Sequence, residues 1–67
     1  MKLALRTYVV VDGEKDIVTS ALEDELINVK HDVEGLIVQL VEAKIFYFVK
    51  WEEIAGYTLT GDAGAVH

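Results

Sequence analysis

Hydrophobic residues gather in short runs that are rich in β-branched and aromatic side chains. The first run covers residues 7–11, and a second run of the same kind covers residues 16–19. Asp12-Gly13 lies between them, and this pair favours a tight hairpin turn because both residues tolerate positive φ angles. The sequence therefore predicts a β-hairpin in the first third of the chain.

A second pair of apolar runs predicts another hairpin further along the chain. Residues 36–41 and residues 44–50 are separated by Glu42-Ala43, and the aromatic content of the later run suits a pleated sheet better than a helix. After them, residues 51–53 are expected to form a short turn. Residues 54–60 are then expected to form a closing strand.

Gly56 interrupts this expected closing strand. A glycine inside a strand suits a β-bulge or the crowded corner of a small barrel, because it adds no side chain where two backbones come close. We therefore expect an irregularity in the sheet at Gly56.

The middle of the chain, residues 20–34, fits two interpretations. Residues 20–23 fit a helix-capping box, and apolar residues then recur at alternating spacings of four and three, which favours a helix over about residues 20–31. These apolar residues would form a seam along one side of a helix, and they are Leu22, Leu26, Val29, Val33, Leu36 and Leu40. In the other interpretation, residues 26–30 form a short strand and residues 31–35 turn into the next one.

These patterns predict an all-β fold, a small barrel of about five to six strands. The alternative is an α+β fold with a β-hairpin, a helix at about 20–31 and a β-meander. A wholly helical zipper is a third interpretation of the same seam. Residues 1–60 are expected to form a single domain, with residues 61–67 as a flexible tail.

The composition adds an expectation about assembly. The chain has 67 residues, of which 52% are hydrophobic, and it contains no cysteine that could form a stabilising disulfide. A barrel of this size has few interior positions, so some apolar surface should remain exposed in a single copy. We therefore predict a homo-oligomer, in which a second subunit covers that surface.

The charge of the chain limits its partners. Twelve acidic residues against six basic ones give a net charge of −6, which repels phosphate backbones over long range. No segment is apolar enough to resemble a membrane span or the hydrophobic core of a secretory signal. A cytoplasmic setting, with no membrane partner, is the resulting expectation.

The residue types that carry chemistry do not form a known catalytic or metal motif. Acidic and hydroxyl side chains between Asp12 and Glu23 have the spacing of a calcium loop, but Ile17 stands where that loop needs glycine. His31 and Ser20 lie in no nucleophile motif. We therefore predict a protein that is not an enzyme and that has no catalytic residue, metal site or cofactor.

The aromatic residues near the end of the chain are the candidate interface. Phe46, Phe48 and Trp51 are expected to contribute to the contact between subunits, because aromatic side chains bury large areas and dominate interface energetics. The alternative is that Phe46 and Phe48, two residues apart on one strand face, belong to the core of a single copy.

Three segments together resemble the two short motifs of the Sm-like proteins, which are small barrels of the SH3-like kind. These segments are Asp12-Gly13, then residues 24–29 (Asp-Glu-Leu-Ile-Asn-Val), and then residues 49–54 (Val-Lys-Trp-Glu-Glu-Ile). A second alignment, which places Asp32 before Gly35-Leu36-Ile37-Val38, is similar to the shorter bacterial members.

The resemblance implies a bent sheet and assembly into a ring through edge strands. It also implies a pocket for single-stranded RNA of the uridine-binding kind, formed by Asn28 and Lys50, with Asp24 orienting Asn28. Trp51 stands where the family has a glycine in its second motif.

These observations lead to three functional hypotheses. The first is a non-enzymatic, homo-oligomeric binding and assembly module. The second is binding of single-stranded RNA through Asp24, Asn28 and Lys50. The third is a monomeric domain that recognises another protein at a sheet edge or through its acidic surface.

Overall fold

The computed structural model describes residues 1–61 and shows an all-β fold. One 3₁₀ turn, η1 (Trp51–Glu53), precedes the final strand, and the described residues contain no α-helix. The predicted flexible tail lies outside the described residues, apart from Gly61. The six strands are β1 (Lys2–Val11), β2 (Glu14–Glu23), β3 (Ile27–His31), β4 (Gly35–Leu40), β5 (Ile45–Lys50) and β6 (Ile54–Thr60).

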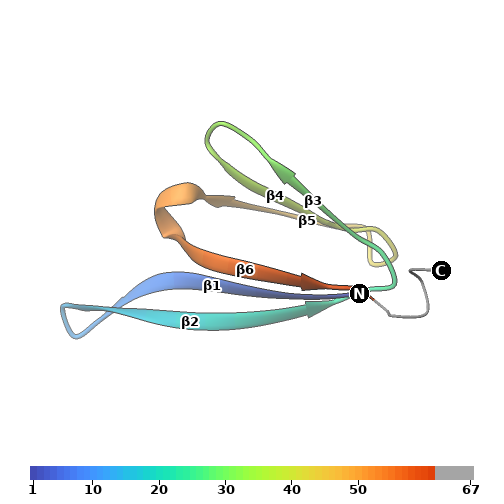
Figure 1. Ribbon diagram of the computed structural model, residues 1–67. Helices are drawn as coiled ribbons and strands as arrows, with labels where there is room; N and C mark the ends of the chain where they lie inside the picture. Colours follow the sequence, from blue (N-terminus) through green and yellow to red (C-terminus); the bar gives the residue numbers. More distant parts are fainter. Residues whose placement is uncertain (62–67) are drawn as a thin grey trace.

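The strands form two antiparallel sheets of three strands each. One sheet has the order β2-β1-β6, and the other is the meander β3-β4-β5. Figure 1 shows them as two layers that face each other, with the end of the β1–β2 hairpin extending beyond the second layer. No strand pairing joins the two sheets within residues 1–61, so the predicted all-β class is confirmed but the barrel is not closed.

The alternative helix at about 20–31 is wrong, because this segment forms the end of β2 and all of β3, which confirms the interpretation of residues 26–30 as a short strand. The burial of β3 alternates with a period of two: Ile27 is buried and Val29 is half-buried, whereas the residues between and after them are exposed. Leu26 and Val33, which continued the helical seam, are both exposed. Burial against the other sheet therefore decides the conformation here, and the helical spacing is coincidental.

The first hairpin is confirmed, and it is longer than its apolar runs suggested. Asp12 and Gly13 have φ angles of 52° and 79°, and Val11 pairs with Glu14 across this two-residue turn. Positive φ at both central residues is the condition for the hairpin turn whose twist matches that of its strands. The pairing continues for ten residue pairs, from Val11–Glu14 to Lys2–Glu23.

The core between the two sheets is small. Leu3 and Leu5 of β1 supply one side of it, and four residues of the meander supply the other side. Those four are Ile27, Leu36, Val38 and Leu40. All six core side chains have at most 5% of their surface exposed. Three of the six come from β4, which makes β4 the central strand of the core.

The predicted irregularity at Gly56 is confirmed. Arg6 pairs with Gly56, but Thr7 pairs with Ile54, so Ala55 is an extra residue in β6 and forms a bulge. A Cβ atom at Gly56 would lie 2.8 Å from a guanidinium nitrogen of Arg6. Gly56 thus leaves room for the Arg6 side chain to cross the sheet.

A second glycine has a role that the sequence did not indicate. Gly35 begins β4 and pairs with Lys50 of β5. A Cβ atom at Gly35 would lie 2.9 Å from the carbonyl carbon of Val49, closer than folded proteins allow. The meander can therefore close at this end only because residue 35 has no side chain.

Candidate functional site

Strand β5 is an edge strand whose apolar side chains are exposed. It pairs with β4 on one side, and no strand of residues 1–61 pairs with it on the other. Its first four residues, Ile45 to Phe48, are all large, apolar or aromatic, and all are exposed. A free edge with this composition is a template for pairing with another chain, and native proteins normally cover such an edge.

The exposed residues of β5 lie on both faces of the sheet. Phe46 and Phe48 pair with Gln39 and Ile37 of β4, which places them on the face directed away from the core. Phe46 has 67% of its surface exposed and Phe48 has 49%. The alternative that these two phenylalanines belong to the core of a single copy is therefore wrong.

The other face of β5 is also incompletely covered. Tyr47 pairs with the fully buried Val38, and Ile45 pairs with the buried Leu40, so both point to the core side of the sheet. Each nevertheless has 40% of its surface exposed. The buried strand β4 and the exposed strand β5 thus share one sheet, and the core ends between them.

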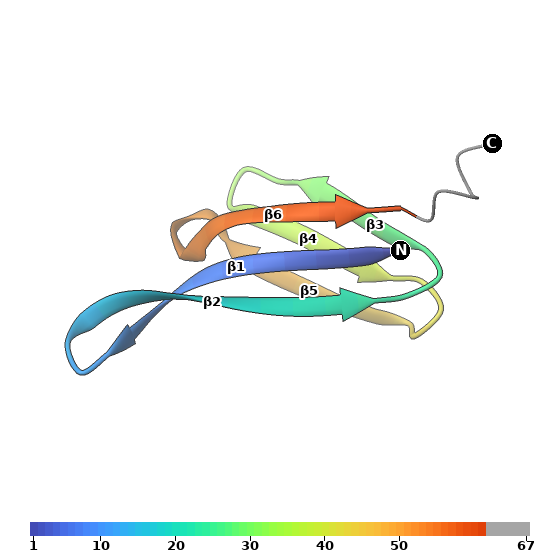
Figure 2. The same ribbon diagram turned by 60° about the horizontal axis from the view of Figure 1, so that its bottom comes forward.

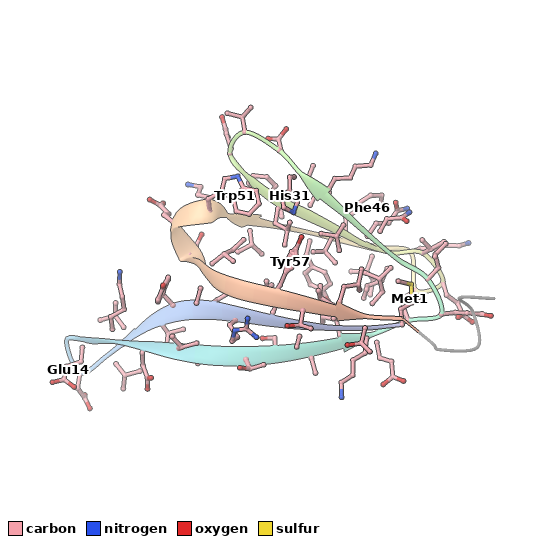
Figure 3. The ribbon with its side chains drawn as sticks, viewed as in Figure 1. Met1, Glu14, His31, Phe46, Trp51 and Tyr57 are labelled. Carbon is pink, nitrogen blue, oxygen red and sulfur yellow. The ribbon has the colours of Figure 1, made fainter. Side chains whose placement is uncertain are left out.

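Trp51, the third predicted interface residue, lies beyond the end of β5 in a cluster of aromatic rings. Its indole Nε1 donates a hydrogen bond to the backbone oxygen of Asp32 at 2.7 Å. Its ring meets the His31 ring edge-on, with 5.1 Å between centroids, and His31 Nε2 lies 2.6 Å from the hydroxyl of Tyr57. Figure 3 shows Trp51 and His31 at the same end of the molecule, with Tyr57 reaching toward them from β6.

We call His31, Trp51 and Tyr57 the aromatic cluster. It connects β3 of one sheet with β6 of the other, through residues that are 26 positions apart in the sequence. Beside it lies an open depression of about 350 Å³, lined by Val33, Glu34, Lys50, Trp51 and Glu52. No local pattern in the sequence predicts this cluster, because its members come together only when the two sheets stack.

Asp24 has a structural role that differs from the predicted one. Its carboxylate accepts hydrogen bonds from the backbone amides of Leu26, Glu42 and Ala43 at 3.2, 3.0 and 3.0 Å. It therefore holds the turn between β4 and β5 against the junction of β2 and β3. Desolvation by itself would raise the pKa of the Asp24 carboxyl, but these amides and that of Glu25 lower the pKa below its ordinary value.

The residues of the predicted RNA pocket do not meet within one copy. The amide nitrogen of Asn28 contacts the side-chain oxygen of Gln39 at 3.5 Å, and the Asp24 carboxylate is held by the turn rather than by Asn28. Across the sheet from Asn28 lies Phe46, and Lys50 is four residues further along β5. At about 3.4 Å per residue, this offset is roughly 14 Å.

The surroundings of Lys50 are unfavourable for a phosphate backbone. The depression beside Lys50 is also lined by the acidic residues Glu34 and Glu52. These carboxylates offset the positive charge of Lys50 where a polyanion would approach. Within residues 1–61, no group of three or more histidine, cysteine, aspartate or glutamate residues could hold a metal ion.

No helix among the described residues has the length and hydropathy needed to cross a membrane. A scan against models of known protein families finds no match, and searches of the curated proteins and of the solved structures find none either.

Proposed function

We propose that the protein is a non-enzymatic assembly module, which binds further copies of itself through the free edge of β5. The observation that carries this proposal is that β5 is unpaired along one edge and apolar on both faces. Pairing with another strand would satisfy its free backbone groups and give the apolar side chains on both faces neighbours across the new strand pair. The resemblance to Sm-like proteins, which assemble through edge strands, points in the same direction.

The chemistry of β5 fits an interface better than it fits a solvated surface. Phe46, Tyr47 and Phe48 are consecutive, and aromatic residues are enriched in the buried centre of protein interfaces. Lys44 and Lys50, which flank the apolar run, supply the polar rim that such interfaces have. Trp51 lies next to this rim and would extend the contact toward the aromatic cluster.

Molar mass by light scattering across a dilution series tests this proposal. We expect the wild-type protein to have a mass of several subunits. We expect the double variant Phe46→Ser, Phe48→Ser to remain folded but to dissociate at concentrations where the wild type is assembled. Val10→Ser removes an exposed apolar side chain from β1 and is the matched control. It should leave the mass unchanged.

A wild type that is monomeric at all concentrations would overturn the proposal. The free edge of β5 would then favour the recognition of a strand from a different protein, which is the monomeric alternative. Binding of single-stranded RNA stays a prediction of the resemblance alone. Titration of oligo-uridine into the wild type and Lys50→Ala tests it, because a Lys50 contact predicts weaker and less salt-dependent binding by the variant.

A further inference from the structure

The other sheet also has a long free edge, which is formed by β2. This strand pairs with β1 on one side, and no strand in the described part of the chain pairs with it on the other. It runs for ten residues, and the first eight of them, Glu14 to Ala21, are exposed. Figure 2 shows β2 at the margin of its sheet, on the opposite side of β1 from β6.

The turn at Asp12-Gly13 determines which residues of β2 present backbone groups at this free edge. In a two-residue hairpin, the residues that flank the turn, here Val11 and Glu14, are hydrogen-bonded to each other. Antiparallel strands then alternate between hydrogen-bonded and non-hydrogen-bonded pairs. Even-numbered residues of β2 therefore bond to β1, and the odd-numbered residues from Lys15 to Glu23 direct their N–H and C=O groups to the free edge.

This alternation restricts how two copies of β2 could pair with each other. Two antiparallel copies form regular hydrogen bonds only if odd-numbered residues lie opposite odd-numbered residues. One such register places Lys15 of each copy opposite Glu23 of the other copy, with Ile17 opposite Ala21. The two Thr19 residues then lie opposite each other on the symmetry axis.

The charges of β2 favour this register over its neighbours. If the register of the two copies shifts by two residues in one direction, Lys15 lies opposite Ala21 and both ion pairs are lost. A shift of the register by two residues in the other direction carries Lys15 past the end of β2, to a position opposite Glu25, so Lys15 has no partner within the paired strand. Among the residues of β2 itself, the Lys15–Glu23 register alone therefore gives two ion pairs related by symmetry. Glu14 then lies opposite Asp24, which is beyond the end of β2 and whose carboxylate is bound by backbone amides of the turn between β4 and β5.

The side chains that would face each other also share one surface of the sheet. Lys15 pairs with Val10 and Glu23 pairs with Lys2, both on the face of β1 opposite to the buried Leu3 and Leu5. The Lys15 ammonium lies 4.8 Å from the centre of the Tyr8 ring, on this same face. Lys15 and Glu23 are thus on the same side of the extended sheet, as an ion pair between the two copies requires.

We propose that β2 is a second assembly edge, where two copies of this chain pair antiparallel about a two-fold axis at Thr19. The pairing joins the two sheets of order β2-β1-β6 into one continuous six-stranded sheet. The contact is isologous, because each copy contributes the same strand in the same register. It uses no residue of β5, so this inference is independent of the interface proposed above.

Disulfide trapping tests the register directly, because the chain contains no cysteine of its own. Opposite residues in a hydrogen-bonded antiparallel pair have Cα atoms about 5.5 Å apart, which a disulfide can bridge. We expect Thr19→Cys to form covalent dimers at least about tenfold faster than Val18→Cys or Ser20→Cys under mild oxidation. In the proposed register, each of those two residues is about 8 Å from its own copy across the axis, which is too far for a disulfide.

Thr58→Cys, on the exposed outer face of β6, measures the background of random collisions. Cross-linking of Thr19→Cys at this background rate would overturn the proposed pairing. Faster cross-linking at residue 18 or 20 would overturn the register, because those positions lie on the axis in the two shifted pairings.

A charge exchange provides a second and independent test. Lys15→Glu places two carboxylates opposite each other at both ends of the contact, so we expect dimer dissociation to become at least about tenfold easier by sedimentation analysis. Adding Glu23→Lys to the same chain restores opposite charges and should recover the dimer. Lys30→Glu on β3 changes the net charge equally and should have little effect. Failure of the double variant to recover, although it is folded, would contradict the proposed ion pairs.

Discussion

Strands β4 and β5 lie side by side in one sheet and have similarly apolar sequences, yet their surroundings differ. Leu36, Val38 and Leu40 of β4 are buried, whereas Ile45 to Phe48 of β5 are exposed. The difference arises from their places in the sheet. β4 has a neighbour on each side and β1 across the core, while β5 is an edge where coverage by the other sheet ends.

This comparison shows that apolar character alone does not determine what is buried in a domain of this size. Small domains bury a smaller share of their surface than large ones, and six core side chains are all that these two sheets enclose. The apolar residues left over are concentrated on β5 and on the β1–β2 hairpin. Their concentration on β5 and on this hairpin is an observation that supports the proposed assembly.

The difference in burial between β4 and β5 is tested most directly by shortening one large side chain on each strand. Leu36→Ala on β4 should lower the free energy of unfolding by about 3 kcal/mol, because it removes a fully buried side chain and leaves a cavity. Phe48→Ala on β5 should lower it by less than about 1 kcal/mol at concentrations where the protein is monomeric. Urea denaturation measures both variants, and equal losses would show that the two strands do not differ as described.

A change at the point where β4 and β5 come closest should have the next largest effect. Gly35→Ala places a Cβ atom against the backbone of Val49, so one strand must move away from the other. We expect a loss of about 2 kcal/mol in the free energy of unfolding, as for other overpacked sites. Gly13→Ala is an informative contrast, since its cost comes from positive φ and nothing lies within 4 Å of the added atom.

A smaller effect is expected where the two sheets are linked by the aromatic cluster. Tyr57→Phe removes the hydroxyl that lies 2.6 Å from His31 Nε2 but keeps the ring. We expect a loss of about 1 kcal/mol in the free energy of unfolding, which is typical of one hydrogen bond. The chemical shifts of the His31 ring should also change, whereas an unchanged spectrum would show that the contact is not formed in solution.

The smallest effect at neutral pH, and the only one that depends on pH, is expected at the turn between β4 and β5. The pKa of Asp24 is lowered in the folded state, so its stabilising effect is fully present above the ordinary aspartate pKa of about 4. This effect is lost as the pH falls through the lowered value. Thermal denaturation should therefore find Asp24→Asn less stable than the wild type at pH 7, with the difference shrinking below pH 4.

The part of the fold that could be predicted from the sequence depends on local chemistry. Asp12-Gly13 predicts a hairpin because of the φ angles that these residues tolerate, and Gly56 predicts a bulge because a side chain there would crowd its neighbour. The β-branched and aromatic residues of β5 predict a strand. Each of these inferences needs only a few neighbouring residues, and each agrees with the structure.

What could not be predicted depends on contacts between distant parts of the chain. The sequence leaves residues 26–30 open between a helix and a strand, because the burial of Ile27 against the other sheet decides their conformation. The resemblance to Sm-like proteins places Asp24 in an RNA pocket, whereas two of the three amides that bind its carboxylate are 18 and 19 residues away in a turn. The meeting of His31 with Tyr57 likewise follows from sheet stacking, which no short motif encodes.

The pairing of β1 with β6 has a consequence for how the protein forms during synthesis. β1 is synthesised before β6, so the sheet β2-β1-β6 is incomplete until translation reaches residue 60. The β1–β2 hairpin and the β3-β4-β5 meander need only nearby residues and can form earlier. Because contacts between distant residues form slowly, the late arrival of β6 should limit the folding rate. Until then, one side of β1 stays open to unintended strand pairing between nascent chains.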